Sequence, residues 1–208
     1  MTDKAPASAA SATTPGPRLG LREKNKARTR AAIRAAALHL ISTQGYAATT
    51  VAQIAEAAEV SHTTFFRYFQ TKEHVMISDD LDDQRQQVLE DIPPGLDRFD
   101  LLRRIISDTV SVDAGDPWAS NIDRIKLIRD EPVLRVAHQR EVDRVVSELT
   151  GFIAGYLGVD VDDFRLRVFI AAVSGVMFHV AERVEVPDET VVGDLMSALD
   201  LLEHGLPV

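Results

Sequence analysis

The chain has 208 residues, of which 45% are hydrophobic, so it can bury a substantial core divided between one small and one larger domain. It contains no cysteine, which excludes disulfides, thiolate metal sites and a thiol nucleophile. Its net charge of −9 would oppose nucleic-acid binding if the charge were spread evenly.

The charge is instead divided unevenly along the chain. Residues 18–72 carry nine Lys or Arg against three Asp or Glu, whereas residues 73–208 carry thirteen against twenty-eight. Attraction for phosphate is therefore concentrated in the N-terminal part of the chain.

The N-terminal residues, MTDKAPASAASATTPGP, are rich in Ala, Ser, Thr and Pro and contain no apolar run. They predict a disordered tail over residues 1–20 rather than a signal peptide or membrane anchor, and hence a cytoplasmic protein. A basic run follows, which is either a solvated helix start or an arm that enters the minor groove of DNA. Its members are Arg18, Arg22, Lys24, Lys26, Arg28 and Arg30.

The most informative segment is TTVAQIAEAAEVSHTTFFRYFQTK, residues 49–72. Its first half carries apolar residues at helical spacing from Val51 to Ala58, and Thr50 is a suitable N-cap. Its second half predicts a helix over 62–69 that Ser61 caps. Two short helices joined by a tight turn are the layout of a DNA-reading helix-turn-helix.

The second helix has two different faces. Phe65 and Phe69 lie four residues apart and predict the buried side. The other side is polar, with hydroxyls, a cation and a phenol that can hydrogen-bond to base edges or phosphates. We expect base-edge or near-base contacts from His62, Thr63 and Thr64, and phosphate contacts from Thr50, Tyr68, Lys72 and Arg67, with Ser61 in the same interface.

Residues 29–73 resemble the DNA-binding domain of the TetR (tetracycline-repressor) family of bacterial transcription regulators. The resemblance joins the lead helix TRAAIRAAALHLISTQGYAATTV to the TFFRYF–x–x–K pattern. It implies that Gly45 follows the first helix, that Tyr46 packs under it, and that Thr49 or Thr50 starts the second. Glu59 departs from the family, which usually has Gly there; a positive φ at this residue would cost about 1 kcal/mol.

The remainder of the chain predicts helices separated by Pro- and Gly-containing breaks. With three helices in the first part, we expect an all-α protein of about nine helices. A helix-turn-helix domain would span 21–75, and a larger ligand-binding and dimerisation domain 76–208. The further helices are expected at 72–90, 96–112, 117–130, 132–157, 163–185 and 189–204.

Residues 124–182 also resemble a C-terminal domain of many actinobacterial regulators of this family, described as binding acyl-CoA-like ligands. The motif is mainly hydrophobic spacing around Pro132, Leu134 and Arg140. The resemblance implies a small hydrophobic or acyl-type effector.

Residues 168–181, VFIAAVSGVMFHVA, are apolar on nearly every side and too few to span a bilayer. One face would pack on its own domain and the other, through Ala171, Ala172, Ser174 and Gly175, on a second subunit. The alternative is a central helix of a monomeric bundle. The last helix would join the dimer contact through Val192, Leu195, Met196, Leu199 and Leu202.

An effector cavity is expected among the helices between the DNA-binding part and the dimer contact, although periodicity alone does not separate cavity wall from core. His138 and Arg135 are the possible polar handles for the effector. The candidate wall residues are Phe99, Leu102, Ile106, Trp118, Ile122, Ile125, Phe152 and Met177.

Enzymatic motifs such as G-x-S-x-G, a phosphate loop or H-E-x-x-H do not occur, and the six His are scattered. We therefore expect no catalytic residue, cofactor or bound metal. The favoured function is a homodimeric regulator, most simply a repressor that an effector releases from palindromic operator DNA. Two alternatives stay open: an activator of the same fold, and a helical interaction protein without specific DNA binding.

Overall fold

The computed structural model describes residues 20–183 and 189–206, and within these ranges every regular element is an α-helix. The all-α expectation is confirmed. None of the described helices is long and apolar enough to cross a membrane. The predicted tail falls almost wholly outside the described residues, as do Arg18 and the expected break at Pro187.

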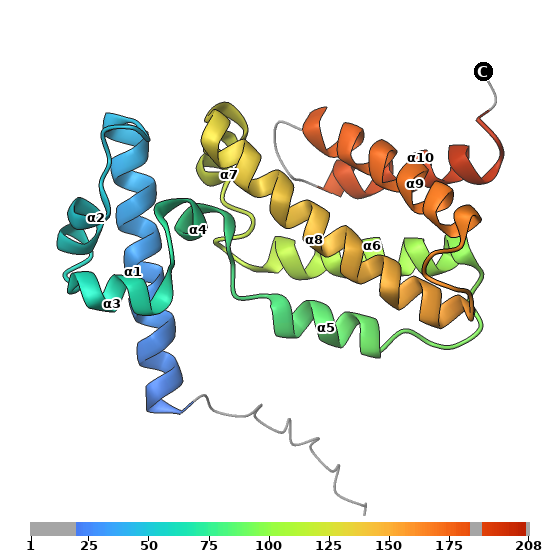
Figure 1. The fold of residues 1–208 in the computed structure, drawn as a ribbon, viewed down its shortest axis with the longest axis horizontal. Helices are drawn as coiled ribbons and strands as arrows, with labels where there is room; N and C mark the ends of the chain where they lie inside the picture. The colour runs from blue at the N-terminus through green and yellow to red at the C-terminus, as the bar shows by residue number, and fades with distance from the viewer. Residues whose placement is uncertain (1–19, 184–188, 207–208) are drawn as a thin grey trace, which may run out of the picture.

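The first four helices form the narrow end of the molecule (Figure 1). They are α1 (Leu21–Gln44), α2 (Val51–Ala57), α3 (His62–Tyr68) and α4 (Lys72–Ile77). The long helix α1 stands beside α2 and α3, and its first turns extend past α3 (Figure 1). Their shared core consists mainly of buried aliphatic and phenyl side chains, including Ile33, Ala37, Ile41, Ile54, Phe65, Phe69, Val75 and Met76.

The other six helices form the larger end. They are α5 (Asp82–Glu90), α6 (Arg98–Gly115), α7 (Ile122–Asp130), α8 (Pro132–Leu157), α9 (Phe164–Arg183) and α10 (Glu189–Glu203). Helix α8 runs across this end: it packs against α4 and α7 and also against α9, while α10 packs on α6 and α9 (Figure 1). A second core forms here around Leu101, Leu102, Ile153, Leu166 and Leu199.

The single helix expected over 72–90 is wrong, because the chain leaves the helix at Ser78. The Ser78 hydroxyl donates to the His74 carbonyl at 2.6 Å, and the Asp79 carboxylate accepts the Leu81 N–H at 3.1 Å. Short polar side chains that bind nearby backbone groups in this way compete with helix hydrogen bonds. The break separates α4 from α5 and raises the number of described helices to ten.

Caps also set two helix starts later than periodicity indicated. Asp97 accepts the N–H groups of Phe99 and Asp100, so α6 begins at Arg98 rather than at residue 96. Asn121 caps α7 through the Arg124 N–H, so the turn that starts at Pro117 lies outside that helix. Carboxylate and amide oxygens at these positions satisfy N–H groups that a helix end leaves without partners.

The first core is not confined to the first four helices. Leu134 of α8 is fully buried in it, and Trp118 and Leu127 pack against it. The expected domain boundary between residues 75 and 76 therefore falls between two fully buried neighbours, Val75 and Met76. Because this core is closely packed, a movement of α7 or α8 will displace the core residues that support α3.

Candidate nucleic-acid interface

Hydrogen bonds at both ends of α2 define where this helix starts and how the chain turns from it toward α3. Thr50 accepts the Gln53 N–H while the Gln53 side chain accepts the Thr50 N–H, which forms a capping box. At the other end Glu59 adopts φ 54°, and the Val60 N–H reaches the Ala55 carbonyl at 2.9 Å. This is a Schellman-type helix end with glutamate where glycine is favoured. The positive φ considered for Glu59 is therefore observed.

The inward side of α3 holds it on the core. Phe65 and Phe69 are buried, as expected. Tyr68, expected to face outward, is half-buried against the same core, and its carbonyl accepts a hydrogen bond from Arg30. Its ring therefore helps to hold α3 on the core.

The outward side of α3 presents His62, Thr63 and Arg67, which are all exposed. It also presents Phe66, which is 46% exposed and was not among the expected site residues. The His62 and Phe66 rings meet edge to face, with centroids 4.8 Å apart. The four-residue spacing of His62 and Phe66 is the sequence signal for this pair, but Phe65 and Phe69 have the same spacing and are both apolar, which favours phenylalanine here as core.

Three of the expected hydroxyls already have partners within the protein, since Thr50 hydrogen-bonds with Gln53 as well. The Ser61 hydroxyl oxygen accepts the Thr64 N–H at 3.0 Å and lies 2.8 Å from the Thr64 hydroxyl. Both groups therefore serve the start of α3. Thr63, which is exposed beside them, is better placed to reach a base edge.

Lys72 ties the start of α4 to the loop between α1 and α2. Its ammonium donates to the carbonyls of Tyr46 at 2.7 Å and Thr49 at 2.9 Å, and it lies 3.8 Å from the centre of the Tyr46 ring. Burial lowers the pKa of Lys72, an effect that Glu131 opposes. The two carbonyls account for two of the three N–H donors of the ammonium.

Three of these residues surround one hollow. Thr50, Phe66 and Lys72 line a space of about 430 Å³ between the start of α2, the end of α3 and the start of α4. The structure thus brings the Thr50 hydroxyl, the exposed Phe66 ring and the Lys72 ammonium, which is already bonded to two carbonyls, around the same hollow.

The basic run is helical from Leu21 onward, and Arg22, Lys24, Lys26 and Arg28 are exposed on α1. Arg30 differs, because its guanidinium pairs with Asp80 at 2.7 Å and lies 4.7 Å from the centre of the Phe69 ring. Burial lowers the pKa of Arg30 against the opposing effect of Asp80. Four exposed cations therefore lie on the first turns of α1, whereas Arg30 is held inside the protein by Asp80 and Phe69.

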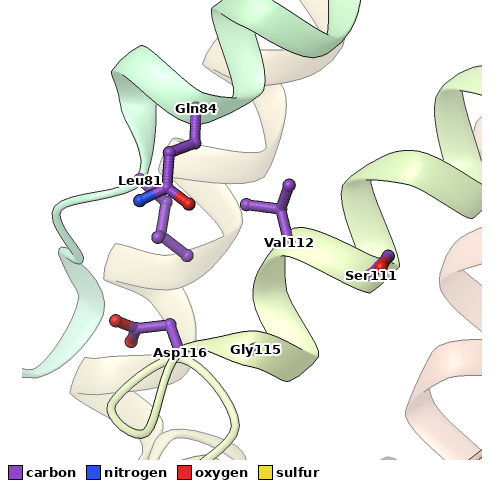
Figure 2. A pocket seen from close by; sticks show the side chains of 6 residues that line it. All are labelled: Leu81, Gln84, Ser111, Val112, Gly115 and Asp116. Carbon is purple, nitrogen blue, oxygen red and sulfur yellow. The ribbon is translucent and has the colours of Figure 1, made fainter. Parts of the chain in front are cut away.

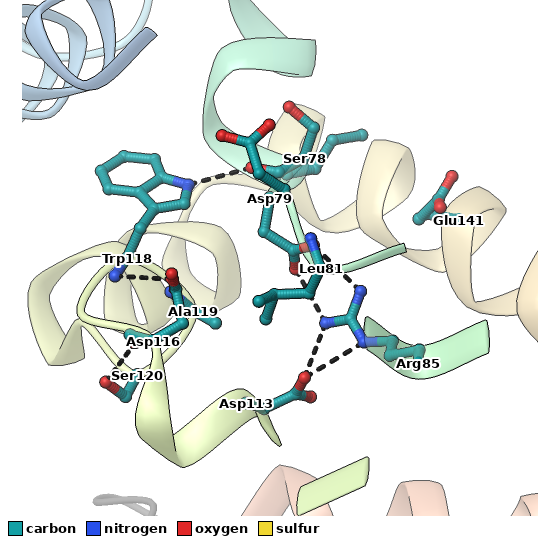
Figure 3. A network of polar contacts seen from close by, with 12 residues as sticks. Ser78, Asp79, Leu81, Arg85, Asp113, Asp116, Trp118, Ala119, Ser120 and Glu141 are labelled. Carbon is teal, nitrogen blue, oxygen red and sulfur yellow. Dashed lines mark hydrogen bonds and ion pairs between the residues drawn. The ribbon is translucent and has the colours of Figure 1, made fainter. Parts of the chain in front are cut away.

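The last carbonyls of α4 are held by side chains from elsewhere in the fold. Arg124 of α7, which is buried, donates to the carbonyls of Met76 at 2.7 Å and Ile77 at 2.9 Å. The Ser78 carbonyl accepts from the Trp118 indole at 2.9 Å (Figure 3). The same carbonyl also accepts from Arg34 at 3.2 Å. Burial lowers the pKa of Arg124 to about 10, so its guanidinium is charged at neutral pH.

A second polar contact holds the break between α4 and α5. Arg85 donates two parallel hydrogen bonds to Asp79, at 2.9 and 2.8 Å, and also reaches Asp113 of α6 (Figure 3). Burial alone would raise the pKa of Asp79, but its bonds with Arg85 hold that pKa below its ordinary value. Burial raises the pKa of Asp113, and the nearby Asp79 carboxylate adds to this effect, while Arg85 opposes it. Arg85 bonds only one oxygen of Asp113 but both oxygens of Asp79. Asp79 is therefore the principal partner.

The expected effector residues do not share one cavity. Phe99, Leu102, Ile106, Phe152 and Met177 belong to the second core, where the Phe99 ring meets that of Phe169. Trp118 packs instead on the first core, Ile122 and Ile125 lie on α7 half-buried, and His138 and Arg135 are exposed on α8. A shallow hollow of about 290 Å³ opens elsewhere, between α5 and α6, and includes Leu81, Val112 and Asp116 (Figure 2).

Helix α9 carries an exposed apolar stripe. Its residues recur at helical spacing and are Phe164, Val168, Ala171, Ala172, Gly175 and Phe178. The expected α10 contribution is corrected: Leu195 and Leu199 are buried within the chain, and Met196 and Leu202 pack on its second core. Val192 is half-buried, as is Ser174 of α9, whereas Leu201 is the exposed leucine of α10.

Comparison with known proteins gives consistent matches over both parts of the chain. The family described as bacterial regulatory proteins, tetR family, matches residues 33–78, and the MftR C-terminal domain matches residues 96–207. The HTH-type transcriptional regulator TcmR of Streptomyces glaucescens is 34% identical over 172 residues, covering 79% of this chain and 76% of TcmR. The crystal structure of Thermus thermophilus FadR, a TetR-family transcriptional repressor in complex with lauroyl-CoA, is 26% identical with a TM-score of 0.52, covering 86% of this chain and 95% of FadR.

Proposed function

Since the chain belongs to the TetR family of DNA-binding transcriptional regulators, we propose that two copies of α3 read a palindromic operator in successive major grooves. The observation that carries the proposal is the outward face of α3, which presents His62, Thr63 and Arg67 on a helix anchored by Phe65 and Phe69. Two-fold related recognition helices suit half-sites about one DNA turn, ~34–36 Å, apart.

The contacts follow from which groups are free to make them. His62 and Thr63 reach base edges, while Arg67 and the third N–H of Lys72 reach phosphates. Thr50 is also proposed to reach a phosphate, for which its hydroxyl gives up the 3.1 Å bond that it donates to the Gln53 side chain. Ser61, Thr64 and Tyr68 mainly hold α3 in place, because their hydrogen bonds or packing lie within the protein. The exposed cations from Arg22 to Arg28 add phosphate contacts beside the recognition helix.

The exposed stripe on α9 is the proposed dimer contact. Small residues at its centre, Ala171, Ala172 and Gly175, let a partner helix approach closely, while Phe164 and Phe178 flank them. A homodimer places the same stripe on both subunits, as two-fold symmetry requires. Residues 21–75 would then carry DNA binding, and residues 76–208 dimerisation and effector binding.

The proposed effector is a small hydrophobic or acyl-type molecule that enters among the helices of the second core. FadR, whose structure contains lauroyl-CoA, supports this class of ligand. In this chain the flexible or planar side chains of Phe99, Phe152 and Met177 are suited to rearrange around an apolar chain. We propose that the protein acts by binding DNA and effector and has no catalytic activity. We also propose that it acts in the cytoplasm, where its operator lies.

The signal is proposed to pass through α7, because Arg124 and Trp118 join the larger end to the last carbonyls of α4. The helix from 72 to 90 cannot act as one rigid lever, since it is broken at Ser78. An effector that moves α7 would shift α4 and the core beneath α3. A coupling of about 1–3 kcal/mol would weaken operator binding about 5–150-fold, and DNA would weaken effector binding equally.

The test begins with duplexes selected by the full-length protein from a randomised pool and measures their binding by fluorescence anisotropy. We expect a palindromic consensus bound far more tightly than random duplex. Lauroyl-CoA is then added while the emission of Trp118, the chain's one tryptophan, is followed. Loss of operator affinity together with a change in emission supports the repressor. A ligand that strengthens operator binding would favour the activator, and no preference for any duplex would favour the interaction protein.

A further inference from the structure

Phe66 has no evident packing role on α3. Its neighbours Phe65 and Phe69 are buried, whereas 46% of Phe66 is exposed. The His62 ring meets it edge to face with centroids 4.8 Å apart, and the Phe65 ring meets it edge to face with centroids 5.3 Å apart. The ring is therefore supported in an outward position by its neighbours.

The surroundings of Phe66 are those of a DNA-facing surface. Thr63 and Arg67 lie on the same exposed side of α3, and the ring borders the hollow lined by Thr50 and Lys72. Residues 18–72 carry nine cationic side chains against three acidic ones. Phe66 therefore lies beside Arg67 and Lys72 in the part of the chain that attracts phosphate, so it will meet the nucleic acid when α3 docks.

The major groove offers such a ring one apolar partner, the C5-methyl group of thymine. The other groups at the base edges in that groove are hydrogen-bond donors and acceptors, and a phenyl ring pressed against them removes water without replacing its hydrogen bonds. Contact with the methyl group instead removes apolar surface of both partners from water.

We propose that Phe66 is a specificity-determining residue that reads a thymine methyl group in each half-site, and that His62 holds its ring in position. This inference rests on the proposed function, in which α3 enters the major groove. It assigns Phe66 to sequence preference, while Arg67 supplies affinity that does not depend on sequence.

Replacement of thymine by deoxyuridine removes only the methyl group and leaves every base-pairing and phosphate contact intact. The selected operator is therefore synthesised with deoxyuridine at one symmetric pair of thymines at a time, and wild type is compared with Phe66→Ala. At the pair that Phe66 reads, wild type should bind about fourfold more weakly per half-site, the equivalent of burying one methyl-sized group. Phe66→Ala should bind both duplexes equally, and Phe66→Leu should keep part of the difference.

Two further variants separate the roles on α3. Arg67→Ala should weaken binding to the thymine and deoxyuridine duplexes by the same factor, and so keep the full methyl effect. His62→Ala should reduce the methyl effect, whereas His62→Phe, which keeps an aromatic edge against Phe66, should retain it. Thermal unfolding of each variant checks that substitution of these exposed side chains leaves the fold intact.

The inference is overturned if wild type is insensitive to deoxyuridine at every thymine pair, or if Phe66→Ala keeps the full sensitivity. Those results leave operator binding itself untouched. If wild type prefers no selected duplex over random DNA, the proposed function fails and the inference fails with it.

Discussion

The guanidinium of Arg124 lies 5.2 Å from the centre of the Trp118 ring, and both side chains donate to backbone carbonyls at the end of α4. Arg34 of α1 lies on the same indole, 5.5 Å from its centre. A helix of the DNA-binding end and a helix of the larger end thus share one aromatic ring and one set of carbonyls. This contact joins the two parts of the molecule more directly than the broken segment between α4 and α5.

Arg124→Gln should destabilise the protein by about 1–3 kcal/mol, because the Met76 and Ile77 carbonyls would lose a charged donor in a buried place. Arg124→Lys should recover only part of this loss, since an ammonium does not reproduce the planar fork of the guanidinium. Urea denaturation measures the effect. Lys126→Ala, on the exposed side of the same helix, is the control and should change stability by less than about 0.5 kcal/mol.

Asp79→Asn should lower stability by about 1–3 kcal/mol at neutral pH, because it breaks the paired bonds to Arg85 while keeping the side chain's shape. The folded pKa of Asp79 lies below its ordinary value, so its contribution is complete above about pH 4 and is lost as the pH falls further. The gap between wild type and variant should therefore be constant from pH 6 to 8 and close in acid. Urea titrations at several pH values measure it.

Asp113→Asn is the matched comparison on the other side of Arg85. The folded pKa of Asp113 is raised, so ionising this group opposes folding as the pH rises above its ordinary pKa. Its removal should cost less than that of Asp79. A larger loss from Asp113→Asn would show that Asp79 is not the main partner of Arg85.

Glu59→Gly should stabilise the protein by about 0.5–1 kcal/mol, because glycine adopts the positive φ of this turn without the steric cost that a side chain meets. Glu56→Gly, inside α2 and also exposed, should instead destabilise by about 1 kcal/mol. Thermal unfolding of the two variants gives opposite shifts in Tm. A decrease in both would mean that the turn carries no strain.

Lys72→Ala and Arg67→Ala should both weaken binding to every DNA sequence and reduce the salt slope by roughly one unit per lost phosphate contact. Only Lys72→Ala should also lower the melting temperature, because Lys72 joins α4 to the Tyr46 and Thr49 carbonyls. Anisotropy at several salt concentrations and thermal unfolding measure the two properties. Unchanged stability in Lys72→Ala would contradict its role as a clamp.

Val168→Asp should convert the dimer to a monomer, because it places a charge within the exposed apolar stripe on α9, next to its small central residues. Operator binding should then fall steeply, since each monomer reads one half-site. Sedimentation gives the mass, and Val161→Asp, exposed in the loop before α9, is the control. A Val168→Asp protein that stays dimeric would place the interface elsewhere.

Local chemistry in the sequence was sufficient to predict most helices and the buried side of α3. Thr50 and Ser61 cap helices as their positions indicate, and Phe65 and Phe69 are buried at the spacing of one helical turn. Pro132 begins α8 and Gly158 ends it, because a fixed φ suits the first position and a left-handed φ the last. These features depend on a few neighbouring residues, so the sequence alone determines them.

Contacts between distant residues decided the rest. Periodicity cannot show that Asp79 bonds Leu81 and ends a helix, that Trp118 lies on the DNA-binding core, or that Lys72 is held by Tyr46 and Thr49. Nor can it separate exposed Phe66 from buried Phe65, since both are apolar residues of one short helix. In each case the partner lies on another element or competes with the local backbone. Only the packing of α1, α7 and α8 around α4 determines which cations remain free for DNA and which hold the protein together.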